Sequence, residues 1–89
     1  MIKSTISISN KLGLHARASA KLTKLAGGYP CDVHMSRNGR RVNAKSIMGV
    51  MMLAAGLGTE VEIETDGDQE HQAMEAIRRL IDDKFGEGE

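Results

Sequence analysis

A histidine followed two residues later by an arginine, His15 and Arg17, is the pair in this sequence whose side chains most clearly suggest chemistry. The pair stands in the segment Gly13–Ser19, where a predicted loop passes into a helix expected to begin at Ala16. The first turn of a helix offers unpaired backbone N–H groups and about half a unit of positive charge, so it attracts anions. An imidazole there can accept a phosphoryl group, whose oxygens would meet those N–H groups and the Arg17 guanidinium. Small side chains are expected to leave this entrance open, namely Ala16, Ala18 and Ser19.

A second segment, Ala44–Gly49, also stands before a predicted helix. Ser46 is a residue type that commonly caps a helix N-terminus, a role that requires no regulatory function. The helix that follows, from Ile47 to about Ala54, has no polar face, so it is either buried or presents an apolar patch to a partner. Full burial is difficult in so small a domain. We therefore expect two groups, the core residues Val50 and Leu53 and the partly exposed residues Ile47, Met48 and Met51.

The remaining elements follow from hydrophobic periodicity. Apolar residues alternate with polar ones in segments 2–8, 30–36, 42–44 and 60–65, which predicts four strands. Asn38-Gly39 is a strong signal for a two-residue hairpin turn between the second and third of them. Helical spacing predicts a first helix that ends at Gly27-Gly28 and a last helix that Asp68 caps and that ends near Phe85. The tail 86–89 is expected to be frayed.

The resulting order, βαββαβα, indicates one α+β domain over residues 1–89. Strands with polar outer residues and three amphipathic helices predict a four-stranded antiparallel sheet covered on one side by the helices. The pattern by itself leaves a ferredoxin-like split βαβ arrangement open.

The composition is that of a globular protein, with 40% hydrophobic and 27% charged residues. No apolar run approaches the roughly 18 residues of a membrane helix, and the N-terminus passes directly into a strand pattern. We therefore expect no membrane insertion, no signal peptide and a cytoplasmic location. The single cysteine, Cys31, excludes an internal disulfide and a cysteine-based metal cluster, and it is expected to be a small core residue.

The net charge is zero, but the two halves of the chain differ strongly. Residues 1–48 hold nine basic residues and one acid, whereas residues 49–89 hold three basic residues and eleven acids. A basic ring around His15 would attract acidic partner proteins and hold a phosphate. The basic residues near the two motifs are Lys11, Arg17, Lys21, Lys24 and Lys45.

The two motifs, together with Asn10-Lys11-Leu12, closely resemble those of the HPr family, the histidine-containing phosphocarriers of the bacterial phosphotransferase system. The resemblance runs from about Ile2 to about Phe85 and implies that family's open-faced β-sandwich. It also implies a phosphoryl carrier that accepts phosphate on Nδ1 of His15 from phosphoenolpyruvate-charged enzyme I and passes it to EIIA-type acceptor domains. Arg17 would neutralise the phosphate charge. Such a chain is a phosphocarrier intermediate rather than a stand-alone catalyst, and no cofactor or metal is predicted.

The resemblance further implies a docking surface on the first helix and the short apolar helix. In some bacteria a kinase acts on the serine that matches Ser46, so this residue is a candidate phosphorylation site. The residues predicted to bind partners are Lys24, Lys45, Ile47, Met48 and Met51. We expect a monomer. Ala18 departs from the family motif, because most members have proline at this position.

Two other functions are compatible with parts of the sequence. A nitrogen-type regulatory phosphocarrier, which acts by partner binding rather than in sugar uptake, would carry the same motifs. A ferredoxin-like nucleic-acid-binding module would suit the basic first half, but only 2% of the residues are aromatic and sheet-surface RNA binding depends on stacking. We therefore expect no nucleic-acid partner.

Overall fold

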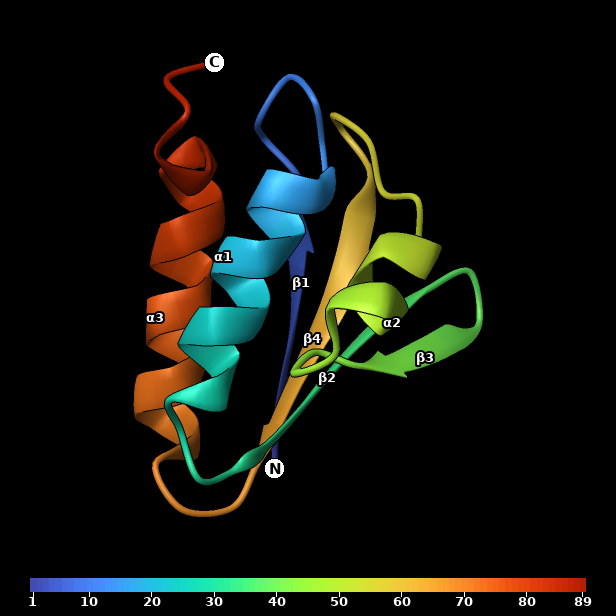
Figure 1. Cartoon of the computed structure of the whole chain (residues 1–89). Coiled ribbons are helices and arrows are strands. Elements are labelled where there is room, and N and C mark those ends of the chain that lie inside the picture. Colours follow the sequence, from blue (N-terminus) through green and yellow to red (C-terminus); the bar gives the residue numbers. More distant parts are fainter.

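The computed structural model describes residues 1–89 as a βαββαβα domain (Figure 1). Its strands are β1 (Ile2–Ser7), β2 (Asp32–Arg37), β3 (Arg40–Asn43) and β4 (Glu60–Asp66). Its helices are α1 (Ala16–Gly27), α2 (Ile47–Met52) and α3 (Glu70–Asp82), followed by a 3-10 turn at Lys84–Gly86. The order of elements and the three helices confirm the arrangement predicted from periodicity.

The four strands form one sheet in the order β1-β4-β2-β3, in which every neighbouring pair is antiparallel. The last strand therefore inserts between the first two, with Ile63 opposite Ser4 of β1 on one side and Met35 of β2 on the other. In a ferredoxin-like split βαβ sheet the third strand lies between the first two, whereas here β4 takes that place and β3 lies at the edge. The ferredoxin-like alternative is wrong for this chain.

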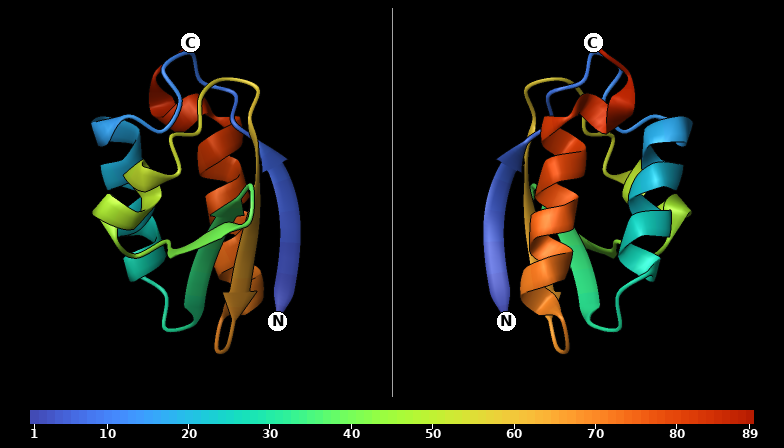
Figure 2. Two further views of the ribbon diagram at one scale, coloured as in Figure 1. Left: turned by 90° about the vertical axis from the view of Figure 1, so that its right-hand side faces the viewer. Right: turned by 90° about the vertical axis from the view of Figure 1, so that its left-hand side faces the viewer.

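All three helices cover one face of the sheet (Figure 2). The core lies between the two layers, because inward-facing strand residues such as Val33, Met35 and Ile63 are at most 1% exposed. Leu22 of α1 and Ile77 of α3 meet them from the helical layer and are fully buried. Cys31 is also buried, as predicted. This packing fixes the position of α1, and with it the position of His15 at its start.

The hairpin between β2 and β3 turns at Asn38 and Gly39, whose φ angles of 51° and 80° are those of the predicted turn. Element boundaries differ by a few residues from the predicted ones. β2 begins at Asp32 rather than at residue 30, and β3 ends before Ala44. α2 ends at Met52, because Ala54 adopts a φ of 49° that a helix cannot contain.

The predicted cap of the last helix by Asp68 is wrong. The residue before α3 is Gln69, which has a φ of 64° and makes no side-chain cap hydrogen bond. Instead, the first helical residue reaches back across the turn, since the Glu70 carboxylate accepts a hydrogen bond of 3.1 Å from the Gly67 N–H. The Thr65 hydroxyl donates to the Glu70 carbonyl oxygen and ties the same turn to the end of β4.

The expectation of a frayed tail is also wrong. α3 ends at Asp82, and Phe85 turns inward with a φ of 55° and is 1% exposed. The ammonium group of Lys21 donates a 2.6 Å hydrogen bond to the Phe85 carbonyl oxygen, and the Lys11 N–H donates one of 2.9 Å to the Glu89 main-chain oxygen. The tail therefore returns to the loop that precedes α1 (Figure 2). No helix of the structure has the length and apolar character needed to cross a membrane.

Candidate functional site

His15 is the N-cap residue of α1. Its backbone is extended, with φ −71° and ψ 178°, and its carbonyl oxygen accepts the first helical hydrogen bond from the Ser19 N–H. The ring nitrogen Nδ1 accepts a hydrogen bond from the backbone N–H of Arg17 at 3.3 Å. The side chain is 27% exposed. Nδ1 thus points to the unpaired amides of the first turn, where an anion would bind.

The loop before His15 is held by a close backbone approach at Gly13. A Cβ atom at this position would lie 2.4 Å from the Ala55 carbonyl oxygen, and the φ of +67° also favours glycine. The next residue, Leu14, is buried and donates its N–H to the same Ala55 oxygen at 2.8 Å. These two contacts fix the chain immediately before the histidine, so the imidazole enters the site from a defined backbone.

The other ring nitrogen of His15 contacts the C-terminal tail. Nε2 lies 2.5 Å from Oε2 of Glu87, whose side chain is 11% exposed. The second oxygen of that carboxylate, Oε1, accepts a 3.0 Å hydrogen bond from Nδ2 of Asn10. The hydrogen bond from Asn10, followed by that from His15, holds the pKa of Glu87 below its usual value against the opposing effect of desolvation. The carboxylate therefore stays ionised in neutral solution.

Sequence reasoning missed Glu87 and Asn10, because it treated the tail as frayed. A signal was present in the alternating glycines of 86–89. Gly86 and Gly88 adopt φ angles of 75° and 80°, which fold the tail back over the start of α1. Five residues line a small pocket at this point: Leu12, His15, Arg17, Glu87 and Glu89.

Arg17 is exposed, and its guanidinium makes no hydrogen bond or ion pair in the structure. This agrees with the absence of a neighbouring acid in the sequence. The small residues of the first turn behave differently from expectation. Ala18 and Ser19 are fully buried, and the Ser19 hydroxyl donates to the Leu14 carbonyl oxygen at 3.0 Å. They belong to the packing under the helix, and only Ala16 borders the open side of the entrance.

Ser46 is the N-cap residue of α2, and its hydroxyl oxygen accepts a 3.2 Å hydrogen bond from the Gly49 N–H. The residue is exposed. The predicted cap is therefore present, at the start of a helix only six residues long.

The short helix divides between core and surface as expected. Val50 and Leu53 are buried, whereas Ile47, Met48 and Met51 are 39%, 68% and 38% exposed. Besides Met1 at the N-terminus, sequence reasoning did not single out three further exposed apolar side chains: Leu12, Met52 and Leu57. Leu12 lines the pocket of His15, and α1 packs against α2. Exposed apolar side chains therefore lie next to the candidate site.

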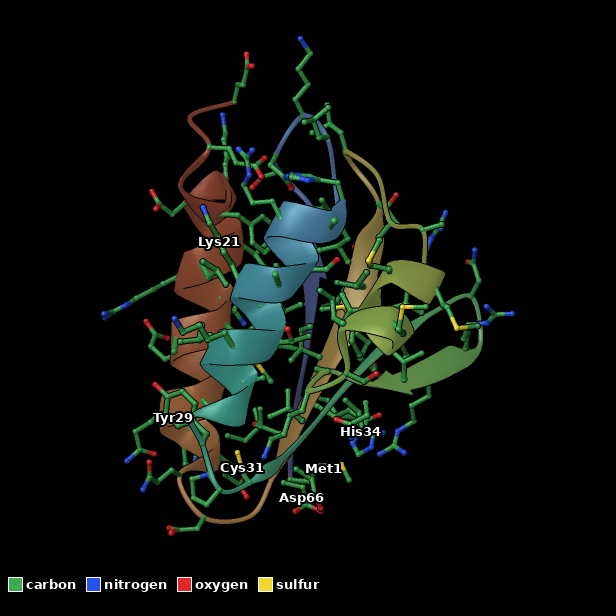
Figure 3. The ribbon with its side chains drawn as sticks, in the orientation of Figure 1. Met1, Lys21, Tyr29, Cys31, His34 and Asp66 are labelled. Atoms are coloured by element: carbon green, nitrogen blue, oxygen red, sulfur yellow. The ribbon has the colours of Figure 1, made fainter.

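The basic residues do not form a ring around His15. Lys45 donates from Nζ to the Tyr29 carbonyl oxygen at 2.8 Å, beyond the C-terminal end of α1. At about 1.5 Å per residue, this end of the twelve-residue helix lies some 18 Å from His15. Lys21 and Lys24 face the groove of about 630 Å³ between α1 and α3, which Leu25, Tyr29 and Leu80 also line. Figure 3 shows Lys21 on the side of α1 toward α3 and Tyr29 just beyond the C-terminal end of α1.

Comparison with known proteins gives a consistent result. The family model described as "PTS HPr component phosphorylation site" matches residues 2–83. The chain is 64% identical to the phosphocarrier protein HPr of Cupriavidus necator over 89 residues, which is the whole of both chains. A crystal structure of HPr from Thermoanaerobacter tengcongensis superimposes with a TM-score of 0.95 at 41% identity, covering 98% of each chain.

A crystal structure of an HPr dimer from the same organism matches with a TM-score of 0.79 at 41% identity, over 98% of this chain and 100% of that one. The family model, the identity along the full length and the agreement of the folds all lead to one assignment. This chain belongs to the HPr family, the phosphocarrier proteins of the phosphotransferase system.

Proposed function

We propose that His15 is the residue of this phosphocarrier that accepts and donates the phosphoryl group, with phosphoenolpyruvate-charged enzyme I as donor and EIIA-type domains as acceptors. The observation that carries the proposal is the position of Nδ1, which accepts the Arg17 backbone N–H at the unpaired start of α1. Its lone pair therefore lies where a tetrahedral anion finds backbone donors.

The transfer needs one covalent step in each direction. The Nδ1 lone pair attacks the phosphorus of the donor, a P–N bond forms, and the bond between phosphorus and the donor atom breaks with its electron pair. On delivery the acceptor attacks the same phosphorus, and the P–N electron pair returns to Nδ1. Catalysis consists of positioning the group and stabilising its charge, since the chain carries no nucleotide-binding loop of its own.

Arg17 supplies the mobile positive charge of the site. Its guanidinium has no partner to leave before it binds a phosphate, and it can present two parallel N–H donors to the phosphate oxygens. The position of Arg17 in the first turn places this charge next to the helix amides. Backbone and side-chain donors would then hold the same phosphoryl group.

The docking surface would comprise the exposed apolar side chains around α1 and α2. Methionines suit a surface that must fit several partners, and Met48 and Met51 are both accessible. Lys24 lies outside this patch, on the α3 side of α1, and Lys45 is tied to Tyr29. Their predicted roles in partner binding would therefore be those of steering charges at the rim of the surface.

Ser46 would serve as a second phosphorylation site for an HPr kinase/phosphorylase. The residue is exposed, and its hydroxyl oxygen is engaged by the Gly49 N–H in the helix cap. A phosphate there would add about −1.5 to −2 charge beside Ile47 and Met48, within the docking surface. Regulation would act through this charge on partner binding rather than on the fold.

The test is a reconstituted transfer chain. The purified protein is incubated with enzyme I and phosphoenolpyruvate, and phosphohistidine is followed as an acid-labile, base-stable label. The labelled protein is then offered sugar-type and nitrogen-type EIIA domains separately, so that the preferred acceptor also identifies the branch. Absence of label on His15 under conditions that label the C. necator relative would refute the proposal.

We also propose that the working carrier is a monomer, since one chain contains His15, Arg17 and the tail that covers them. Sedimentation of the phosphorylated and free forms measures this directly. A dimer that transfers phosphate only in the dimeric state would contradict it.

A further inference from the structure

Two hydrogen bonds select the same tautomer of His15. A backbone N–H only donates, so the Arg17 amide requires a lone pair on Nδ1. An ionised carboxylate only accepts, so the contact of 2.5 Å with Glu87 requires a hydrogen on Nε2. Neutral histidine has one donor and one acceptor nitrogen, and these two partners assign them without conflict.

Asn10 makes this arrangement rigid. The residue is fully buried, and its Nδ2 group donates to the Gly13 carbonyl oxygen at 2.8 Å and to Glu87 Oε1 at 3.0 Å. Its Oδ1 atom has no hydrogen-bond partner. An unpaired buried oxygen costs stability, and rotation of the amide could not remove the cost without placing Oδ1 against two acceptors. Asn10 is thus a fixed donor that anchors the Glu87 carboxylate opposite Nε2.

We propose that Glu87 is a positioning residue for phosphoryl transfer, which fixes His15 as the Nε2–H tautomer and thereby directs the phosphoryl group to Nδ1. The inference rests on the proposed role of His15 and extends it to the C-terminal tail. Glu87 lies at the nitrogen opposite the helix start, so it orients the ring without occupying the place of the phosphate.

The tautomer matters in both directions of transfer. In the Nε2–H form Nδ1 carries a lone pair, which can attack phosphorus once the Arg17 N–H that it accepts is released. In the Nδ1–H form Nδ1 has no lone pair for this attack. When the phosphoryl group leaves, the P–N electron pair returns to Nδ1. If Nε2 still carries its hydrogen, the product is neutral imidazole. Loss of that hydrogen would instead require imidazolate as the leaving group, which is far less stable.

Other charged groups around the ring do not supply this function. The Arg17 backbone N–H lies on the Nδ1 side, where the guanidinium would meet the phosphate, and Lys21 is bound to the Phe85 carbonyl oxygen. Glu89 lines the same pocket, but its contact with the loop is through its main-chain oxygen and not its carboxylate. Lys11 contributes only its backbone N–H. Glu87 is the one carboxylate that contacts the imidazole.

Glu87→Gln is the discriminating variant, because an amide has one acceptor and one donor end. If its oxygen accepts from Asn10, its NH₂ group faces Nε2 and favours a lone pair there. That lone pair would force the hydrogen onto Nδ1, against the Arg17 amide. In catalytic triads the same exchange of carboxylate for amide beside a histidine leaves the geometry intact and imposes the wrong tautomer. Asp83→Asn removes one carboxylate charge from an exposed residue between α3 and the tail, outside the pocket of His15, and is the matched control.

The first measurement uses the unphosphorylated protein with ¹⁵N-labelled histidine at pH about 8.5, some two units above the ordinary imidazole pKa. The ring nitrogen shifts report the tautomer directly. A charge-assisted hydrogen bond biases such an equilibrium by about ten- to a hundredfold. We expect the Nε2–H form to dominate in the wild type and in Asp83→Asn, and the ratio of the Nε2–H to the Nδ1–H form to fall by about tenfold or more in Glu87→Gln.

The second measurement follows the rates of phosphate uptake from enzyme I and of delivery to an EIIA domain. Both rates should fall by about tenfold or more in Glu87→Gln and remain unchanged in Asp83→Asn. An unchanged tautomer ratio in Glu87→Gln overturns the inference, as does normal transfer despite a shifted ratio. The proposed function fails separately, by absence of label on wild-type His15.

Discussion

The starts of α1 and α2 are alike in local geometry and different in surroundings. Each is capped by a side chain of its N-cap residue, through His15 Nδ1 to the Arg17 N–H and through Ser46 Oγ to the Gly49 N–H. At α1 the unpaired guanidinium of Arg17 lies in the first turn, and the Glu87 carboxylate of the tail contacts Nε2 of the His15 ring. At α2 the first turn contains no charged side chain, and exposed apolar residues surround the cap.

The comparison teaches that a helix N-terminus is only the beginning of a phosphate site. A six-residue helix supplies a weaker set of aligned dipoles than one of twelve residues, and Ser46 has no cation to add. His15 combines the amides with a nucleophile, a counter-charge and an orienting acceptor. Under the proposed function, the start of α1 would therefore pass a phosphate on, whereas a phosphate at α2 would change what binds beside it.

The largest effect is expected from His15→Ala. Labelling by enzyme I and phosphoenolpyruvate should disappear, because no other nucleophile lies at the helix start. The fold should persist, with a loss of about 1 kcal/mol in the free energy of unfolding from the missing cap. Label retention after base treatment and urea unfolding measure the two quantities.

Ser46→Ala provides the matched control for this prediction, since it removes the other cap while leaving the nucleophile. It should keep full labelling and lose a similar amount of stability. Full labelling of the His15→Ala protein would place the phosphoryl group elsewhere and break the comparison.

Arg17→Gln should have the next largest effect. Loss of the guanidinium removes a charge-assisted contact that only the phosphoryl group makes, and such contacts correspond to about a tenfold change in rate or more. Single-turnover transfer from enzyme I measures it. Arg79→Gln, which removes an exposed arginine of α3 paired with Glu75, should leave the rate unchanged. Equal slowing in both variants would mean that only overall charge matters.

A smaller effect is expected from Ser46→Asp. Aspartate also caps helices and its charge favours the helix start, so stability should hardly change. Phosphorylation of His15 by enzyme I should slow by about fivefold, because desolvation and repulsion of the new charge oppose docking of an acidic, apolar partner surface. Added salt should restore part of the rate.

Ser46→Asn separates charge from capping, since asparagine caps equally well without charge. It should transfer at the rate of the wild type. If Ser46→Asp accepts phosphate as fast as the wild type, Ser46 is only a cap and the docking surface lies elsewhere.

The sequence was sufficient for the order of elements, because periodicity reports which face of each strand or helix is buried. The alternation around Val33 and Met35 and the Asn38-Gly39 turn are local signals of this kind. It did not determine the sheet order, which depends on insertion of β4 between β1 and β2. The prediction that Asp68 caps α3 was wrong for a related reason. The Glu70 carboxylate, inside the helix, accepts the hydrogen bond from the turn at Gly67.

For the candidate site, the sequence correctly predicted that His15, Arg17 and Ser46 stand at helix starts, and their roles in phosphoryl transfer stay predictions. It missed Glu87, which is 72 residues from His15 and reaches it only after the chain has folded. The predicted ring of basic residues around His15 was wrong, because residues close to a motif in the sequence need not lie close to it in the folded chain. Lys45 adjoins the second motif and yet contacts the far end of α1.

The smallest effect, and the one that concerns the backbone of α1 alone, is expected from Ala18→Pro. Ala18 is the third residue of the helix, and the backbone ladder begins only at the next residue, with the Ser19 N–H to the His15 oxygen. Proline there loses no hydrogen bond and restricts the unfolded chain, so we expect a gain of about 0.4–1 kcal/mol in the free energy of unfolding and unchanged transfer.

Ala16→Pro is the control, because it restricts the backbone of the unfolded chain in the same way at the exposed first residue of the helix. Because Ala18 is fully buried, the proline ring must also find room in the core. A loss of several kcal/mol in Ala18→Pro alone would show that the start of α1 is packed more tightly than a proline-bearing helix allows.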